Sequence, residues 1–496
     1  MMKDSFANGG VLQESCEMTR FRLNEISIGS LKGIKTYNFL ATLLYVLADF
    51  FTIFLSILFS YKLYQWLGIG QKAVYQGPDI ISATLTVTLS ALIILYLFGS
   101  YKNESSVLNV EEIKNVIQGF SITFVLFVVI TLFTKLPVSR YMLVFAYALS
   151  LLALVVERTI LYHLFSFTKL LRPFGKKVLI YGAGELGIAV YRSLINSPKL
   201  GIVPVGFVDD RRNKTGSICY PNGFNCENGV SVLGTGKEII KLREKIHFDE
   251  VIIAIPSKSD EFLLDIVNSL KKNRIRMSFV PNLYQIFLDK IKMQKIGNIP
   301  IFSESDEDEN GIYPRIKQSI DFFTSVFLLI LISPFFIVFA LLIKIDSKGP
   351  VFFKQDRIGK NGKNFKIYKF RSLFCDAEPY EVNPLDSKDA RITRFGRFLR
   401  KTSLDEIPQL INVIKGDMSL VGPRPEMPFI ASGYTDIHRE RLKILPGITG
   451  LWQLSGDRRK AIHENMEYDL YYKNNMSFFL DLAILLETLI FAFRGI

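Results

Sequence analysis

The stretch "KKVLIYGAGELGIAVYRSLI" (residues 176–195) reads as a buried strand, a glycine turn and a helix in immediate succession. Its glycines form a G-x-G-x-x-G pattern at Gly182, Gly184 and Gly187. Such a turn lets the backbone approach a pyrophosphate at a helix N-terminus, and Asp209, at the end of a second predicted strand, could accept a ribose hydroxyl. Strand and helix continue to alternate, which predicts a Rossmann-like α/β domain with a parallel sheet over residues 171–300.

The glycine turn supports a nucleotide-binding fold but does not by itself indicate redox chemistry. The Tyr-x-x-x-Lys pair of short-chain dehydrogenases and epimerases is absent from this region of the sequence. We therefore expect a nucleotide site that is regulatory or vestigial, and both alternatives stay open.

Upstream lie four apolar runs, each near the roughly 20 residues that a helix needs to cross the hydrocarbon core. They cover residues 39–59, 80–98, 117–133 and 142–164. Glu157 and Arg158 fall near the end of the fourth run, where a helix would leave the bilayer and charges cost little. We predict an N-terminal segment (1–35) and a four-span transmembrane domain (36–170).

Basic residues flank this transmembrane domain on both sides. They are Arg20, Arg22, Lys32 and Lys35 before it, and Lys169, Arg172, Lys176 and Lys177 after it. An even number of spans with positive flanks predicts that both ends are cytoplasmic. The formal charge of +13 fits an anionic lipid surface and phosphate-bearing substrates, and it fits equally well a surplus that only sets topology.

Targeting, disulfide and zinc motifs are not predicted. The polar, basic first 35 or so residues carry no signal-peptide pattern. The four cysteines show no paired spacing, and only four histidines exist, so neither a disulfide framework nor a zinc site is expected.

Downstream of the α/β domain, the acidic stretch "SESDEDEN" (303–310) predicts a linker over residues 301–314. A fifth apolar run follows inside a predicted helix (319–345), with Ser333-Pro334 at its middle. Proline removes a backbone donor and clashes with the preceding turn, and Ser333 can bond a carbonyl left unpaired. A straight span with a mild kink and a broken helix both stay open.

The chemistry concentrates in "RITRFGRFLRKTSLDEIPQLINVIKGDMSLVGPRP" (391–425). Asp405 and Glu406 follow a basic run that includes Arg400. Ser403-x-x-Glu406 matches a capping box, which would explain the glutamate structurally. Alternatively, a carboxylate among guanidinium groups stays ionised and can attack phosphorus or hold Mg²⁺.

Other basic and acidic residues surround this block. "FKQDRIGKNGKNFKIYKFRSL" (353–373) supplies Lys369 and Arg371. Pro423-Arg424-Pro425 holds an arginine on a stiff loop suited to bidentate phosphate binding. A glycine-rich turn, "PGITGLWQLSG" (446–456), and Asp469 in "EYDLYY" follow.

Together these motifs resemble the bacterial sugar transferases that make polyprenyl-diphosphate sugars. These are the large monotopic phosphoglycosyl transferases, of the undecaprenyl-phosphate galactose- or glucose-phosphotransferase type. The matching segments appear in the family's order over residues 315–496, and the "LRKTSLDE…GDMSLVGPRP" block is highly specific.

The resemblance implies transfer of a hexose-1-phosphate from a UDP-sugar, galactose or glucose, to undecaprenyl phosphate with release of UMP. That reaction is the first membrane step of exopolysaccharide, capsule or O-antigen synthesis. Asp405 would be the nucleophile that forms an aspartyl-phosphosugar, and Glu406 would hold Mg²⁺. Residues that would organise the substrate phosphates, the nucleotide or the metal are Lys369, Arg371, Arg400, Arg424 and Asp469.

The resemblance also implies an α/β-type catalytic domain (315–496) on the cytoplasmic face of the bacterial inner membrane, in a multi-pass protein. Ser333-Pro334 would be the break of a re-entrant helix that returns to the face it entered. Membrane lipid is an expected partner, a homodimer stays open, and no nucleic acid is expected.

One motif departs from the family pattern. This chain has Ser455-Gly456-Asp457-Arg458 where the family usually has Ser-Gly-Arg or Asn-Gly-Arg. The sugar therefore stays open among galactose, glucose and an N-acetylated form. A membrane-tethered NAD-dependent epimerase or dehydratase and a non-catalytic scaffold are the competing hypotheses.

Overall fold

The computed structural model describes residues 8–69, 77–102, 109–134, 138–168, 175–195, 197–211, 218–219, 230–255, 260–280, 291–296, 299–304, 312–375, 389–455 and 466–492. The chain forms two compact units. They are Met1–Asn109 with Gly119–Tyr284, and Val110–Gln118 with Gln285–Ile496.

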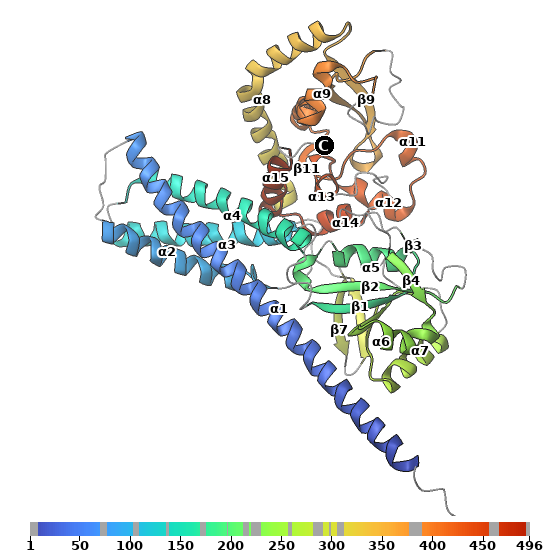
Figure 1. The fold of residues 1–496 in the computed structure, drawn as a ribbon. Coiled ribbons are helices and arrows are strands. Elements are labelled where there is room, and N and C mark those ends of the chain that lie inside the picture. The colour runs from blue at the N-terminus through green and yellow to red at the C-terminus, as the bar shows by residue number, and fades with distance from the viewer. Residues whose placement is uncertain are drawn as a thin grey trace, which may run out of the picture. The chain divides into compact units, whose positions relative to one another are not determined.

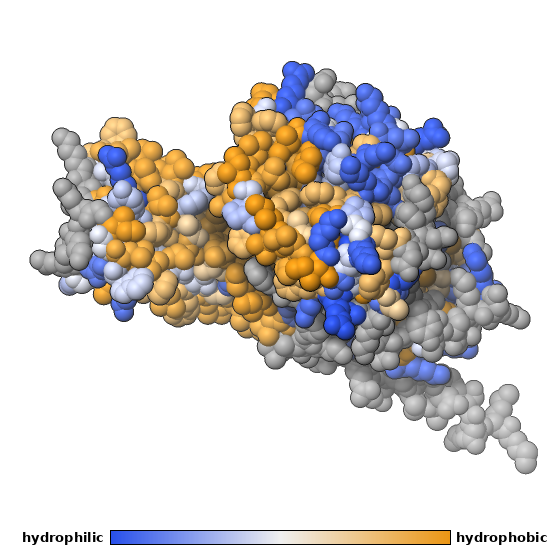
Figure 2. All heavy atoms as spheres, turned by 90° about the horizontal axis from the view of Figure 1, so that it is seen from above, coloured by the Kyte–Doolittle hydropathy of each residue, from blue (hydrophilic) through white to orange (hydrophobic). Residues whose placement is uncertain are grey.

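Long helices form over the four apolar runs. They are α1 (Asn8–Leu67), α2 (Gly77–Leu97), α3 (Val110–Thr134) and α4 (Arg140–Thr168). Among the described residues, these helices and α8 (Ile312–Asp346) are long and apolar enough to cross a membrane. Many of their apolar side chains are exposed, as the orange surfaces in Figure 2 show. The predicted multi-pass membrane protein is therefore supported by its helices.

Arg158 of α4, which was predicted to lie where the helix leaves the bilayer, makes a contact inside the protein that the sequence did not indicate. It is fully buried, and it donates to Asp49 of α1 at 2.6 Å. Tyr101 donates to the same carboxylate oxygen at 2.6 Å, and the guanidinium lies 4.6 Å from the ring centroid of Tyr45. Pairing with a carboxylate and an aromatic face offsets the cost of burying the charge.

The predicted Rossmann-like domain is confirmed. Its strands are β1 (Lys176–Tyr181), β2 (Ile202–Val208), β3 (Ile218–Cys219), β4 (Val230–Gly234), β5 (Glu250–Ile253) and β6 (Arg276–Phe279). The sheet order is β3-β4-β2-β1-β5-β6, and only β3 is antiparallel to its neighbour. The strand order reverses at β1, so the glycine turn lies at the topological switch point.

Helices cover both faces of this sheet. They are α5 (Glu185–Ile195), α6 (Ile239–Lys245) and α7 (Asp260–Lys272), with short 3₁₀ helices η3 (Pro198–Leu200) and η5 (Gly236–Glu238). Tyr191 and Leu194 of α5 pack with Ile180, whereas α6 and α7 pack on the face that carries Leu179. Two covered faces explain why these strands are continuous apolar runs.

Part of the predicted linker (301–314) is a β-strand. Strands β7 (Ile291–Ile296) and β8 (Ile299–Glu304) form an antiparallel hairpin. Strand β8 therefore extends into the predicted linker, because pairing with β7 continues up to Glu304.

The second unit combines short sheets with many short helices (Figure 1). Its strands are β9 (Phe352–Ile358), β10 (Asn364–Phe370), β11 (Ser419–Val421) and β12 (Gly447–Thr449). Its helices after α8 are η7 (Lys360–Gly362), α9 (Arg394–Lys401), η8 (Leu404–Gln409), α10 (Leu410–Ile414), α11 (Pro428–Ala431), α12 (Asp436–Glu440), η9 (Arg441–Lys443), α13 (Leu451–Leu454), α14 (Met466–Asn475) and α15 (Phe478–Ala492). β9 pairs antiparallel with β10, and β11 pairs parallel with β12.

Helix α8 bends, as the Ser333-Pro334 pair predicts. Figure 1 shows it as two limbs that meet at a bend. Pro334 cannot donate to the carbonyl of Ile330, and the hydroxyl of Ser333 donates to that carbonyl at 2.8 Å. The side chain thus replaces the hydrogen bond that the proline removes.

Both ends of α8 are attached to the rest of the second unit. Near its start, Lys317 pairs with Asp481 of α15 at 2.6 Å. At its end, Asp346 accepts from the backbone N–H of Phe395 at 2.8 Å. Thus the two limbs leave and rejoin the same compact unit.

Candidate active site

Asp405 and Glu406 lie in η8, directly after α9. Ser403 adopts a left-handed conformation (φ 55°, ψ 17°) that turns the chain between these helices, and its side chain makes no capping hydrogen bond. The N–H of Glu406 donates instead to the Ser403 carbonyl, at 3.2 Å. The capping-box alternative is therefore wrong, and the glutamate needs another explanation.

The side chain of Glu406 faces two cations from distant parts of the sequence. Its Oε1 accepts from Nζ of Lys369 in β10 at 2.7 Å and lies 3.5 Å from Nη2 of Arg424, in the loop after β11. Three of the motifs found in the sequence thus converge on one carboxylate.

Asp405 is partly buried beside this cluster. Burial raises its pKa to about 6, and the negative charge of Glu406 acts in the same direction. The positive charges of Lys369, Arg400 and Arg424 oppose that rise. A carboxylate whose pKa is raised by burial among cations is a candidate functional group.

Arg400 ends α9 on the same side of the site. Burial lowers its pKa, and the charge of Asp405 partly offsets that shift. Helix α9 begins at a well-formed cap, because the side chain of Thr393 accepts from the N–H of Gly396 at 2.9 Å. A capped helix holds the arginine at a fixed place relative to the acids.

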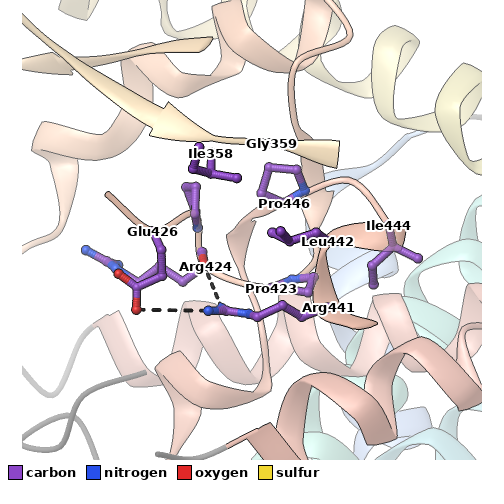
Figure 3. Close-up of a pocket in the computed structure, with 10 residues that line it drawn as sticks. Ile358, Gly359, Pro423, Arg424, Glu426, Arg441, Leu442, Ile444 and Pro446 are labelled. Atoms are coloured by element: carbon purple, nitrogen blue, oxygen red, sulfur yellow. Dashed lines mark hydrogen bonds and ion pairs between the residues drawn. The ribbon is translucent and has the colours of Figure 1, made fainter. Parts of the chain in front are cut away.

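Arg424 is positioned by an aromatic ring as well as by its loop. Its guanidinium carbon lies 5.9 Å from the ring centroid of Trp452, in α13, which is the tryptophan of the "PGITGLWQ" turn. Behind the loop is a pocket lined by Pro423, Glu426, Arg441, Leu442, Ile444 and Pro446, among others (Figure 3).

Two predicted site residues are engaged elsewhere. Arg371 donates to the carbonyls of Ser347 and Lys348 at 2.7 and 2.9 Å, so it holds the chain just beyond the end of α8. Asp469 is 3% exposed and pairs with Arg441 at 2.8 Å. Arg441 carries no motif signal, since it sits among several charged residues in "DIHRERLK".

The described carboxylates of this site could provide part of a coordination shell for magnesium. Among the residues that the structure describes, no three Asp, Glu, His or Cys side chains cluster closely enough to hold a metal ion. Asp405 and Glu406 offer two carboxylates, and Mg²⁺ is commonly bound by one or two carboxylates together with substrate phosphates. The donor set suits an ion that binds with a diphosphate.

In the Rossmann-like domain, two of the three motif glycines are required by the local backbone geometry. Gly182 has φ +114°, and a Cβ on Gly187 would lie 1.8 Å from the Gly182 carbonyl oxygen, whereas a Cβ on Gly184 would meet nothing within 4 Å. Asp209 accepts from the N–H groups of Ala183 and Arg211 at 2.9 and 3.0 Å. The carboxylate predicted for a ribose therefore also holds the glycine turn.

The departure at Asp457 and Arg458 lies outside the described residues.

Comparison with known proteins covers both units. Residues 312–495 match the family described as bacterial sugar transferase, and residues 79–281 match one described as CoA-binding domain. A UDP-glucose:undecaprenyl-phosphate glucose-1-phosphate transferase of Klebsiella pneumoniae is 30% identical over 424 residues, which are 82% of this chain and 88% of that protein.

Two further relatives carry other sugar names. An undecaprenyl-phosphate galactose phosphotransferase of Salmonella typhimurium is 29% identical over 397 residues, 76% of this chain and 80% of that protein. A UDP-N-acetylgalactosamine-undecaprenyl-phosphate N-acetylgalactosaminephosphotransferase of Aeromonas hydrophila is 39% identical over 188 residues, 36% of this chain and 44% of that protein. Because it matches the family model and is similar to the Klebsiella protein over most of both chains, this protein belongs to the bacterial sugar transferase family.

Proposed function

We propose that this protein transfers a hexose-1-phosphate from a UDP-sugar to undecaprenyl phosphate and releases UMP. One observation carries the proposal: Asp405 lies beside Glu406 at the point where Lys369 and Arg424 converge. The names of its relatives support the same reaction class. This step would begin the membrane phase of exopolysaccharide, capsule or O-antigen synthesis.

The reaction proceeds by two displacements at the phosphorus that carries the sugar. In the first, a carboxylate oxygen of Asp405 forms a bond to that phosphorus, and the bond to the bridging oxygen breaks, so UMP leaves with the electron pair. In the second, a phosphate oxygen of undecaprenyl phosphate attacks the same phosphorus and frees Asp405. A covalent intermediate lets a soluble and a lipid substrate use one site in turn.

Charge neutralisation is the task of the surrounding residues. Lys369 and Arg424, which both face Glu406, would supply positive charge to the diphosphate. Glu406 would hold Mg²⁺ beside the phosphates, and the chemistry this ion would supply is neutralisation of the leaving group's charge.

The bent helix α8 supports a re-entrant membrane anchor. A straight helix of 35 residues would be about 52 Å long and would place its ends on opposite faces of a bilayer. Both ends of α8 contact the second unit instead, and Pro334 with Ser333 supplies the bend. We place the catalytic domain on the cytoplasmic face of the bacterial inner membrane.

The sugar is glucose or galactose in this proposal, by likeness to relatives of those names that match most of the chain. The N-acetylgalactosamine relative matches a smaller part of it.

The test combines the purified protein with undecaprenyl phosphate and a panel of UDP-sugars and measures the nucleotide released. UMP, formed with UDP-glucose or UDP-galactose, is the expected product. Asp405→Asn should abolish it, whereas Asp436→Asn, at an exposed aspartate of α12, should keep it. Release of UDP would indicate ordinary glycosyl transfer, and full turnover by Asp405→Asn would indicate a scaffold role for the acids, so either result overturns the proposal.

A further inference from the structure

The loop that carries Arg424 is anchored at every carbonyl. From Pro423 to Glu426, four consecutive carbonyl oxygens each accept one hydrogen bond. The donors, in that order, are the N–H of Gly447 at 2.8 Å, Nη2 of Arg441 at 2.8 Å, Nη1 of Arg357 at 3.1 Å and the N–H of Ile358 at 2.9 Å. Such a loop has little freedom to move, because the two prolines also fix their φ angles.

Arg441 makes the anchor at Arg424 itself. The residue is 2% exposed, and its guanidinium reaches the hydroxyl of Tyr434 at 2.8 Å, Asp469 at 2.8 Å and the Arg424 carbonyl at 2.8 Å. Figure 3 shows the guanidinium joined by dashed lines to Glu426 and to the backbone of Arg424. The planar fork of arginine has enough donors in fixed directions for these four partners, which the single ammonium of lysine does not reproduce.

We propose that Arg441, oriented by Asp469, is a positioning residue that sets where the guanidinium of Arg424 meets the diphosphate. This inference rests on the proposed function. Arg441 is buried, and its Nη2 donates to the backbone carbonyl of Arg424. It acts through the backbone of Arg424, whose side chain reaches toward Glu406 and Trp452. Asp469 then acts by orienting Arg441, and not as a direct ligand of the substrate.

A purely structural role would not demand this arrangement. A buried ion pair can often be replaced by apolar side chains without loss of stability, so a fully buried Arg-Asp pair is weak evidence for stabilisation. Catalysis, in contrast, is sensitive to small displacements of a phosphate-binding group, since a shift of about 1 Å can cost about 100-fold in rate.

The decisive experiment is a double-mutant cycle between Arg441→Lys and Arg424→Ala. The measured quantity is kcat/KM for the UDP-sugar, which in a two-step displacement reports the first step alone. Arg441→Lys keeps the charge beside Asp469 and should lower kcat/KM by about 100-fold in the natural background. In the Arg424→Ala background it should change kcat/KM by no more than about 2-fold, because the group it positions is gone.

Tyr434→Phe is the matched control. It removes another hydrogen bond of the same guanidinium and leaves the bond to the Arg424 carbonyl, so it should change kcat/KM by less than about 3-fold. If Arg441→Lys does not fold, Asp469→Asn is carried through the same cycle, since Asp469 orients the guanidinium of Arg441.

Additive losses in the cycle, or an equal loss in Tyr434→Phe, would overturn the positioning role. That result would leave the reaction itself standing, provided that Asp405→Asn still abolishes UMP release. Activity of Asp405→Asn would overturn the reaction instead, so the two failures are distinguishable.

Discussion

The protein contains two pairs of adjacent acids, Asp209-Asp210 after β2 and Asp405-Glu406 in η8, and they have opposite surroundings. Asp209 accepts from two backbone N–H groups. Asp210 accepts from the hydroxyl of Tyr181 at 2.7 Å and from the N–H of Gly236 at 2.9 Å. These acids connect segments of the Rossmann-like domain to one another.

In the second pair, the partners are side-chain cations. Glu406 meets Lys369 and Arg424, and Asp405 has its pKa raised by burial against the pull of three positive charges. Acids that satisfy backbone donors stabilise a fold, whereas acids held among cations with a perturbed pKa are suited to chemistry. The comparison separates two motifs that look alike in the sequence.

The largest difference between the pairs is expected in turnover. Asp405→Asn should lower UMP release by about 10⁴-fold or more, because the attacking oxygen is lost. Asp209→Asn should change it by less than about 3-fold, because that carboxylate serves the glycine turn of a separate domain. Initial rates of UMP release from the two purified variants check this, and equal losses would erase the distinction.

The next effect concerns the cations. Lys369→Met should lower kcat/KM by about 100-fold, since a positive charge facing both acids and the diphosphate is removed. Lys366→Met, at an exposed lysine of the same strand, is the control and should act like the natural protein. A loss in both variants would mean that the strand, and not the charge, is responsible.

A third effect is the pH dependence. The pKa of Asp405 is raised to about 6, so below pH 6 the nucleophile is protonated and kcat/KM should fall about tenfold for each further pH unit. Among the cations, Lys369 lowers this pKa the most. In Lys369→Met the pKa of Asp405 should therefore be higher, and the remaining activity should begin to decrease at a higher pH than in the natural protein. A flat profile down to pH 5 would contradict the assignment of Asp405.

The smallest effect is on stability, and we expect it in only one of the two pairs. Asp209→Asn should lower the free energy of unfolding by about 1 kcal/mol, because a hydrogen bond to the turn is weakened. The pKa of Asp405 is higher than the ordinary 3.8, so its folded state loses stability as pH rises through about 6. Asp405→Asn should therefore not lower the melting temperature at pH 7.5, measured by thermal unfolding in detergent.

Local patterns in the sequence predicted the fold well. The strand-turn-helix at residues 176–195, the four apolar runs and the bend at Pro334 each depend on neighbouring residues, and each appears in the structure. The wrong expectation, a capping box at Ser403, assumed that a residue's role follows from its own helix. The buried contact between Arg158 and Asp49 likewise depends on a second helix.

For the site, the sequence located the acids and three of the basic residues that surround them. The sequence could not locate Arg441, because its role depends on contacts that form only in the folded chain. These contacts are with Asp469, Tyr434 and a loop carbonyl. Asp469 was predicted to organise substrate or metal, whereas in the structure its carboxylate pairs with Arg441.

The buried pair between Asp49 and Arg158 has a consequence for how the protein is made. The two residues are 109 positions apart, so Asp49 enters the membrane well before its cationic partner has been synthesised. An acidic side chain near the centre of a helix in hydrocarbon costs about 3 kcal/mol on insertion scales. Helix α1 is therefore stable in the bilayer only after α4 has packed beside it. We expect a chain truncated after α3 to be degraded by membrane quality control.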